Sequence, residues 1–174
     1  MSVILLADDS PHAQRMGQRI LAEEDHQVVC VSDGEAAALR LPEADPDVVI
    51  ADAHLPGRSG IELCRYIKSS SRYVRVILTV GSLEALDEAG AKLAGCDAIL
   101  RKPFEASVMA ETLAPLLAAA RNDRQTMAAA NSSPAVVAAQ PPDDIRAAVE
   151  RAVERELPRL LDELTQRVLL ALGH

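Results

Sequence analysis

Four of the short apolar runs in residues 1–120 end next to side chains that can do chemistry. Asp8 and Asp9 follow the first run. Asp52 follows the third, Thr79 ends the fourth, and Lys102 comes soon after the fifth. Carboxylates held close together raise one another's pKa unless a cation compensates, and Mg²⁺ prefers such oxygen ligands. Because a lysine and a hydroxyl can hold phosphoryl oxygens, these residue types indicate a phosphoryl-transfer site with a carboxylate nucleophile.

Alternating apolar runs and amphipathic stretches must position these residues. The runs are short and mostly β-branched, which is typical of strands buried on both faces, and the stretches between them are typical of helices. Five such βα units predict an α/β domain with a parallel sheet and helices on both faces. The predicted strands are Val3–Ala7, Val28–Val31, Val48–Ala51, Val74–Thr79 and Ala98–Leu100, and the predicted helices are Pro11–Glu23, Gly34–Leu41, Gly60–Ser69, Ser82–Leu93 and Glu105–Leu117.

The order of the strands decides whether the acidic residues meet. Open parallel sheets bind ligands outside the carboxyl ends of their strands, where the strand order reverses. With the order 2-1-3-4-5, the first and third strands are neighbours there, so Asp8, Asp9 and Asp52 converge. Acidic residues after a strand often only cap the next helix, and each residue alone allows that explanation. Their joint placement at strand ends favours a site.

These residues belong to longer motifs. The motifs are Asp8-Asp9-Ser10, the segment Asp52-Ala-His-Leu-Pro-Gly-Arg-Ser-Gly60, Thr79, and Lys102-Pro103-Phe104. Together they resemble the receiver domain of two-component response regulators, the CheY-like family, over residues 1–120. The resemblance implies a flavodoxin-like, doubly wound (βα)5 fold with a parallel sheet of five strands in the order 2-1-3-4-5.

The resemblance also implies a role for each acidic residue. Asp52 matches the phosphoacceptor, which takes a phosphoryl group from the phosphohistidine of a histidine kinase or a phosphotransfer protein. Asp9 matches the acid that binds Mg²⁺ directly, and Asp8 the one that usually acts through water. Asp52 and the main-chain carbonyl of His54 complete the implied metal set.

Two further residues match groups that hold the phosphoryl oxygens, namely Thr79 and Lys102. The resemblance implies a cis peptide before Pro103, which turns Lys102 inward. The implied protein is not a turnover enzyme, since it catalyses only its own phosphorylation and dephosphorylation.

Four positions tune or modify the family's switch. The second residues after the phosphoacceptor and after the hydroxyl tune hydrolysis in the family, and here they are His54 and Gly81. The alternative for His54 is that it is a half-exposed loop residue whose side chain has little effect on hydrolysis. Ile99 stands where the family has an aromatic that swings inward, and Val80 where alanine is usual. The groups for phosphorylation are complete, but the usual hydroxyl–aromatic readout lacks its aromatic.

The remainder of the chain predicts two further segments. Residues 121–142 are rich in Ala, Asn, Ser, Gln and Pro, which predicts a flexible linker. Residues 143–174 predict an amphipathic helix, kinked or split near Pro158. A lone amphipathic helix is marginal in water, so its apolar stripe needs a partner. The receiver of the same chain, a second copy and another protein are the options, and the long linker favours association between chains.

Composition limits the partners and the compartment. The net charge of -8 and the three aromatic residues (one Phe, two Tyr, no Trp) argue against nucleic-acid binding. The three scattered cysteines indicate reduced thiols without a disulfide or zinc site. No apolar stretch approaches the ~20 residues that span a bilayer, and the start does not resemble a signal peptide. We expect a soluble, cytoplasmic protein without a DNA-binding output domain, which signals through protein contacts.

Three alternatives stay open at this point. A pseudo-receiver would keep the fold as a scaffold with vestigial phosphorylation, and Ile99 favours it. A phosphatase of the haloacid-dehalogenase type also uses a strand-end aspartate and Mg²⁺, but it requires a second aspartate where this chain has His54. A nucleotide-binding relative of flavodoxin is weaker, because no Gly-rich loop follows the first strand.

Overall fold

Five parallel strands form one sheet in the order β2-β1-β3-β4-β5, which confirms the predicted fold class. The structure is a computed structural model that describes residues 1–132, and the predictions for residues 133–174 lie outside the described residues. Apolar side chains fill the central strands β1 and β3, which have neighbours on both sides. The strands are β1 (Val3–Ala7), β2 (Gln27–Val31), β3 (Val48–Asp52), β4 (Arg75–Gly81) and β5 (Ala98–Lys102).

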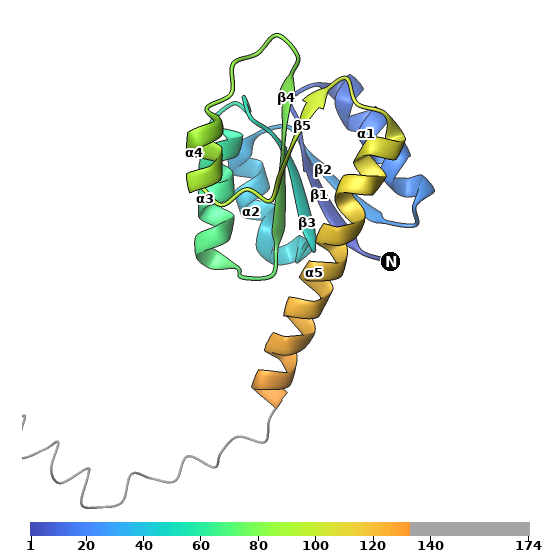
Figure 1. Ribbon diagram of the computed structural model, residues 1–174, viewed down its shortest axis with the longest axis vertical. Helices are drawn as coiled ribbons and strands as arrows, with labels where there is room; N and C mark the ends of the chain where they lie inside the picture. Colours follow the sequence, from blue (N-terminus) through green and yellow to red (C-terminus); the bar gives the residue numbers. More distant parts are fainter. Residues whose placement is uncertain (133–174) are drawn as a thin grey trace, which may run out of the picture. The chain divides into compact units, whose positions relative to one another are not determined.

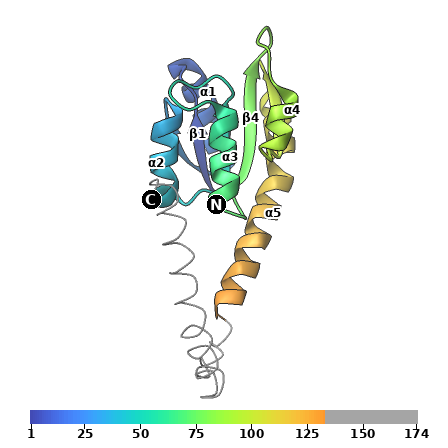
Figure 2. The same cartoon turned by 90° about the vertical axis from the view of Figure 1, so that its left-hand side faces the viewer.

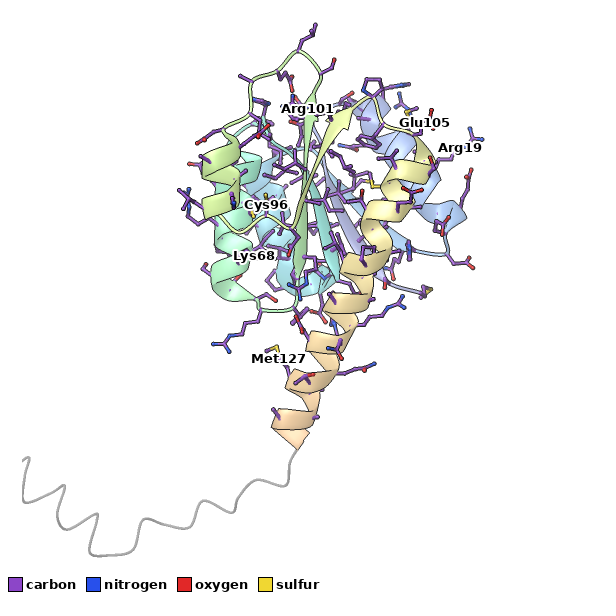
Figure 3. The ribbon with its side chains drawn as sticks, in the orientation of Figure 1. Arg19, Lys68, Cys96, Arg101, Glu105 and Met127 are labelled. Atoms are coloured by element: carbon purple, nitrogen blue, oxygen red, sulfur yellow. The ribbon has the colours of Figure 1, made fainter. Side chains whose placement is uncertain are left out.

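Helices cover both faces of this sheet (Figure 1). On one face α1 and α5 pack through Leu21, Met109 and Leu113. On the other face α2, α3 and α4 pack against the sheet, and these three helices stand in front of it in Figure 2. Side chains fill the layers between sheet and helices (Figure 3). The helices are α1 (Pro11–Glu23), α2 (Gly34–Ala44), α3 (Gly60–Ser70), α4 (Glu88–Leu93) and α5 (Ala106–Ser132).

Local signals begin the helices that follow β1 and β3. Ser10 caps α1 by accepting a hydrogen bond from the main-chain N–H of Ala13, and Pro11 stands in the first turn. Gly60 begins α3 against the main chain of Asp52, where a Cβ would lie 2.3 Å from the Asp52 carbonyl oxygen. Only glycine allows this close approach, which brings α3 directly behind the end of β3.

The helix predicted for Ser82–Leu93 is shorter than expected. Residues 82–87 form a loop instead, and α4 begins at Glu88 with Asp87 as its N-cap. The Asp87 carboxylate accepts a hydrogen bond of 2.8 Å from the main-chain N–H of Gly90. This cap competes with an earlier helix start, so the chain between β4 and α4 forms a turn and loop over residues 82–87.

Helix α5 continues to Ser132, so the prediction of a flexible linker is wrong for residues 121–132. Side-chain contacts of residues 121–124 with the far end of the sheet stabilise the beginning of this part. Arg121 donates to the hydroxyl of Ser2 at 2.8 Å, and Asp123 pairs with Arg75.

Arg124 makes a second set of contacts. It pairs with Asp45 and Asp47 and lies over the Tyr73 ring, with its guanidinium carbon 4.3 Å from the ring centroid. Because charged side chains make these contacts, the sequence of this part has no apolar periodicity that would predict a helix.

None of the helices in residues 1–132 combines the length and the apolar character that crossing a bilayer requires.

Candidate functional site

The ends of β1, β3 and β5 bring Asp8, Asp52 and Lys102 into direct contact. The Lys102 Nζ donates to the carboxylate of Asp8 at 2.5 Å and to the carboxylate of Asp52. Both acids are buried, with 3% of Asp8 and 7% of Asp52 exposed. One ammonium thus bridges two buried carboxylates, which is the central feature of the site.

Main-chain groups fix both carboxylates. Asp8 Oδ1 accepts a hydrogen bond of 2.9 Å from the N–H of Ser10, and Asp52 Oδ1 accepts one of 2.7 Å from the N–H of His54. The side chain of Gln14 donates to the Asp8 carbonyl at 2.6 Å and ties α1 to the end of β1. Because these donors are main-chain groups that directly follow β1 and β3, the carboxylates are held in place before any ligand arrives.

The two acids determine the charge of Lys102. Burial alone lowers the pKa of a lysine, but the hydrogen bonds and charges of Asp52 and Asp8 outweigh it here and raise the pKa of Lys102 above its ordinary value. Lys102 is therefore an ammonium at neutral pH. The peptide that joins it to Pro103 is cis, as the resemblance to receiver domains implied.

Thr79 lies beside Asp52 in the sheet. The two residues are register partners between β3 and β4, and Thr79 is 2% exposed. Thr79, Asp8 and Lys102 also line a cavity of about 430 Å³ between α1 and the start of α5, whose other walls are mainly apolar. The structure therefore brings four predicted residues together at one edge of the sheet.

Asp9 is the predicted residue that stands apart. It is exposed, next to the buried Asp8. Among residues 1–132, the carboxylates of Asp8, Asp9 and Asp52 do not form a group spaced as metal ligands. The donor set still fits Mg²⁺, since it is made of hard oxygens and one ammonium neutralises only one of the two buried carboxylates.

A residue that the sequence did not reveal, Glu84, lies at the mouth of the site. Its carboxylate accepts a hydrogen bond of 2.7 Å from the N–H of Gly81 and lies 3.3 Å from Nδ1 of His54. Atoms of Asp52, His54 and Glu84 suited to metal binding all lie within 4.8 Å of one another. The predicted helix Ser82–Leu93 included Glu84. In the structure Glu84 lies in a loop, and the one sequence feature that could have indicated this loop is Asp87, the N-cap of α4.

The remaining predicted positions lie around the β4 and β5 ends. Val80 is fully buried, and Gly81 is half-buried beside Glu84. Ile99 lies on the edge strand β5 opposite Leu78 and is 36% exposed. An aliphatic side chain thus occupies the position of the expected aromatic.

Fold and site together define a doubly wound α/β domain with an acidic, lysine-bridged pocket at the strand ends. The model of the response regulator receiver domain matches residues 4–114, and the chain belongs to this family. Receiver domains interact with histidine kinases or phosphotransfer partners and generally bind Mg²⁺ through their acidic pocket.

Curated relatives are much longer than the matched region. The chain is 32% identical over 127 residues to the sensory/regulatory protein RpfC of Xanthomonas campestris pv. campestris, which covers 68% of this chain and 17% of that protein. It is 30% identical over 102 residues to the DNA-binding response regulator MtrA of Mycolicibacterium smegmatis, which covers 59% of this chain and 44% of that protein. The chain therefore spans less than half the length of these relatives.

Solved structures agree with the fold. The signal receiver domain of a histidine kinase from Syntrophus aciditrophicus superposes with a TM-score of 0.62 at 29% identity, over 68% of this chain and 91% of that one. The chemotaxis response regulator CheY4 of Vibrio cholerae superposes with a TM-score of 0.61 at 24% identity, over 67% of this chain and 98% of that one.

Proposed function

We propose that this receiver accepts a phosphoryl group on Asp52 from the phosphohistidine of a histidine kinase or a phosphotransfer protein. The observation that carries the proposal is the Lys102 ammonium bridging the buried Asp8 and Asp52. A lysine with a raised pKa between two carboxylates is a fixed positive charge at the point where phosphoryl oxygens would arrive. The relatives' names, a sensory/regulatory protein and a response regulator, support the same role.

The residues divide the reaction among themselves. A carboxylate oxygen of Asp52 attacks phosphorus, the P–N bond to the donor imidazole breaks, and the product is an acyl phosphate with a neutral histidine as leaving group. The Lys102 ammonium moves from the carboxylates to a phosphoryl oxygen, and the Thr79 hydroxyl donates to another. When bound by Asp8, Asp9, Asp52 and the His54 carbonyl, Mg²⁺ supplies positive charge to the phosphoryl oxygens.

The product of this reaction is short-lived and signals through protein contacts. An acyl phosphate is a mixed anhydride, so water hydrolyses it to the free Asp52 carboxylate and inorganic phosphate without a second protein substrate. We infer that the chain acts as a self-limiting phosphoacceptor and not as a turnover enzyme. The exposed Met16 and the half-buried Ile20 on α1 line the cavity next to Asp8 and offer apolar contacts to a docked phosphodonor protein.

A second candidate function rests on Ile99. Without an aromatic at this position, the chain would serve as a scaffold whose fold matters and whose phosphorylation does not. Incubation with acetyl phosphate and Mg²⁺, followed by intact-protein mass measurement, separates the two. The proposal expects a gain of one phosphoryl group in the wild type and none in Asp52→Asn, whereas the scaffold expects no gain in either.

A further inference from the structure

The side chain of Asp52, the last residue of β3, meets two side chains from loops, those of His54 and Glu84. The His54 Nδ1 and a Glu84 carboxylate oxygen lie 3.3 Å apart, and both side chains are half exposed. Each offers a metal-binding atom within 4.8 Å of the others and of the Asp52 carboxylate. The β4–α4 loop that carries Glu84 lies at the same end of the sheet as the site (Figure 1).

Glu84 is held in this place by the glycine at position 81. The Glu84 carboxylate accepts from the N–H of Gly81 at 2.7 Å, and the N–H of Glu84 donates back to the Gly81 carbonyl at 3.1 Å. A Cβ on Gly81 would lie 2.7 Å from the same Glu84 oxygen. The absent side chain thus makes the space that the carboxylate fills, and the turn aims it at His54.

We propose that Asp52, His54 and Glu84 form a site for a borderline divalent cation such as Zn²⁺. An imidazole nitrogen with two carboxylates is a donor set that suits Zn²⁺ and its spectroscopic substitute Co²⁺, whereas Mg²⁺ prefers oxygen ligands alone. The two sets therefore share the Asp52 carboxylate, and the side chains of His54 and Glu84 stand in place of Asp8 and Asp9. Half exposure of His54 and Glu84 leaves the ion a path from solvent.

The consequence for signalling rests on the proposed function. A cation bound to Asp52, His54 and Glu84 would lie at the half-exposed mouth of the site, where it would block the approach of a phosphodonor to Asp52. Zinc at this site would keep the receiver unphosphorylated, and removal of zinc would restore phosphorylation of Asp52.

Visible absorption of Co²⁺ added to the full chain tests the site without phosphorylation. We expect saturable ligand-field bands with one equivalent of Co²⁺, displaced by Zn²⁺ and retained in excess Mg²⁺. His54→Ala and Glu84→Gln should each weaken Co²⁺ binding at least tenfold. The matched controls are His12→Ala and Glu105→Gln, which change an exposed histidine on the α1 side of the cavity and an exposed glutamate before α5. Neither residue belongs to the group of Asp52, His54 and Glu84, so both should leave Co²⁺ binding unchanged.

Other outcomes overturn the proposal. Absence of saturable bands would do so, and so would equal Co²⁺ affinities in the wild type, His54→Ala and Glu84→Gln, since His54 and Glu84 would then contact each other without holding a cation. Circular dichroism shows whether each variant is folded, and the exposed side chains make folding defects unexpected. If Co²⁺ binds as described but acetyl phosphate does not modify Asp52, the metal site stands and the phosphoacceptor proposal fails.

Discussion

Lys102 donates a hydrogen bond to the carboxylate of Asp52 across the intervening strand β4. Two residues from the ends of different strands are thereby joined, and Asp8 shares the same ammonium. This relationship concentrates charge at one buried point and makes Lys102 the residue whose loss has the clearest consequence.

Replacing Lys102 with methionine should lower the rate of Asp52 phosphorylation by acetyl phosphate by roughly 100-fold or more, because a preorganised charge on the phosphoryl oxygens is lost. Time-resolved intact-mass measurements give the rate. The matched control is Lys92→Met, which removes an exposed lysine from α4. A rate within twofold of the wild type for Lys102→Met would contradict the assigned role.

Arg124 should stabilise both the domain and the last turns of α5. Arg124→Ala removes ion pairs with Asp45 and Asp47 and the contact with the Tyr73 ring, and we expect the free energy of unfolding to fall by about 1–2 kcal/mol. Urea denaturation measures this change, and hydrogen exchange in residues 121–132 should speed up.

The control for this change is Arg19→Ala. Arg19 lies on the outer side of α1 (Figure 3), and its pair with Glu23 is exposed to solvent. Surface pairs of this kind contribute little, so the loss should stay below ~0.5 kcal/mol. Equal effects of the two substitutions would show that the contacts of Arg124 have no special weight.

Asp45 should make stability depend on pH on the acid side. The hydroxyl of Tyr73 and the guanidinium of Arg124 outweigh burial and hold the pKa of Asp45 below its ordinary value. The unfolded chain then binds a proton more readily, so this stabilisation is present above about pH 4 and is lost as the pH falls through the folded pKa. Urea midpoints between pH 6 and pH 3 should therefore fall less steeply in Asp45→Asn than in the wild type. Parallel curves would refute the assignment.

Gly81→Ala should separate the Glu84 contact from the rest of the site. The added Cβ meets the far end of the Glu84 side chain, which can rotate away, so the domain should lose less than about 1 kcal/mol. The displaced carboxylate no longer reaches His54, and Co²⁺ affinity should fall as it does in Glu84→Gln. Unchanged Co²⁺ affinity in a folded Gly81→Ala protein would argue that Glu84 is not a ligand.

The sequence predicted those parts of the molecule that depend on local pattern. Period and β-branching identify the strands, and the strand ends then place Asp8, Asp52 and Lys102 at one edge. The position of Glu84 in a loop at the site was not predicted, because residues Ser82–Leu93 have a helical pattern that does not indicate the cap at Asp87. The last part of α5 was not predicted for another reason, since it depends on contacts with residues that are distant in sequence.

The central claim is that Asp52 is the phosphoacceptor, and one measurement tests it most directly. The chain of 174 residues is incubated with acetyl phosphate and Mg²⁺, the acyl phosphate is reduced with borohydride, and peptides are mapped by tandem mass spectrometry. The account predicts conversion of Asp52 to homoserine in the wild type, with Asp8 and Asp9 unmodified. Conversion at another aspartate, or none at all while the protein stays folded, would contradict it.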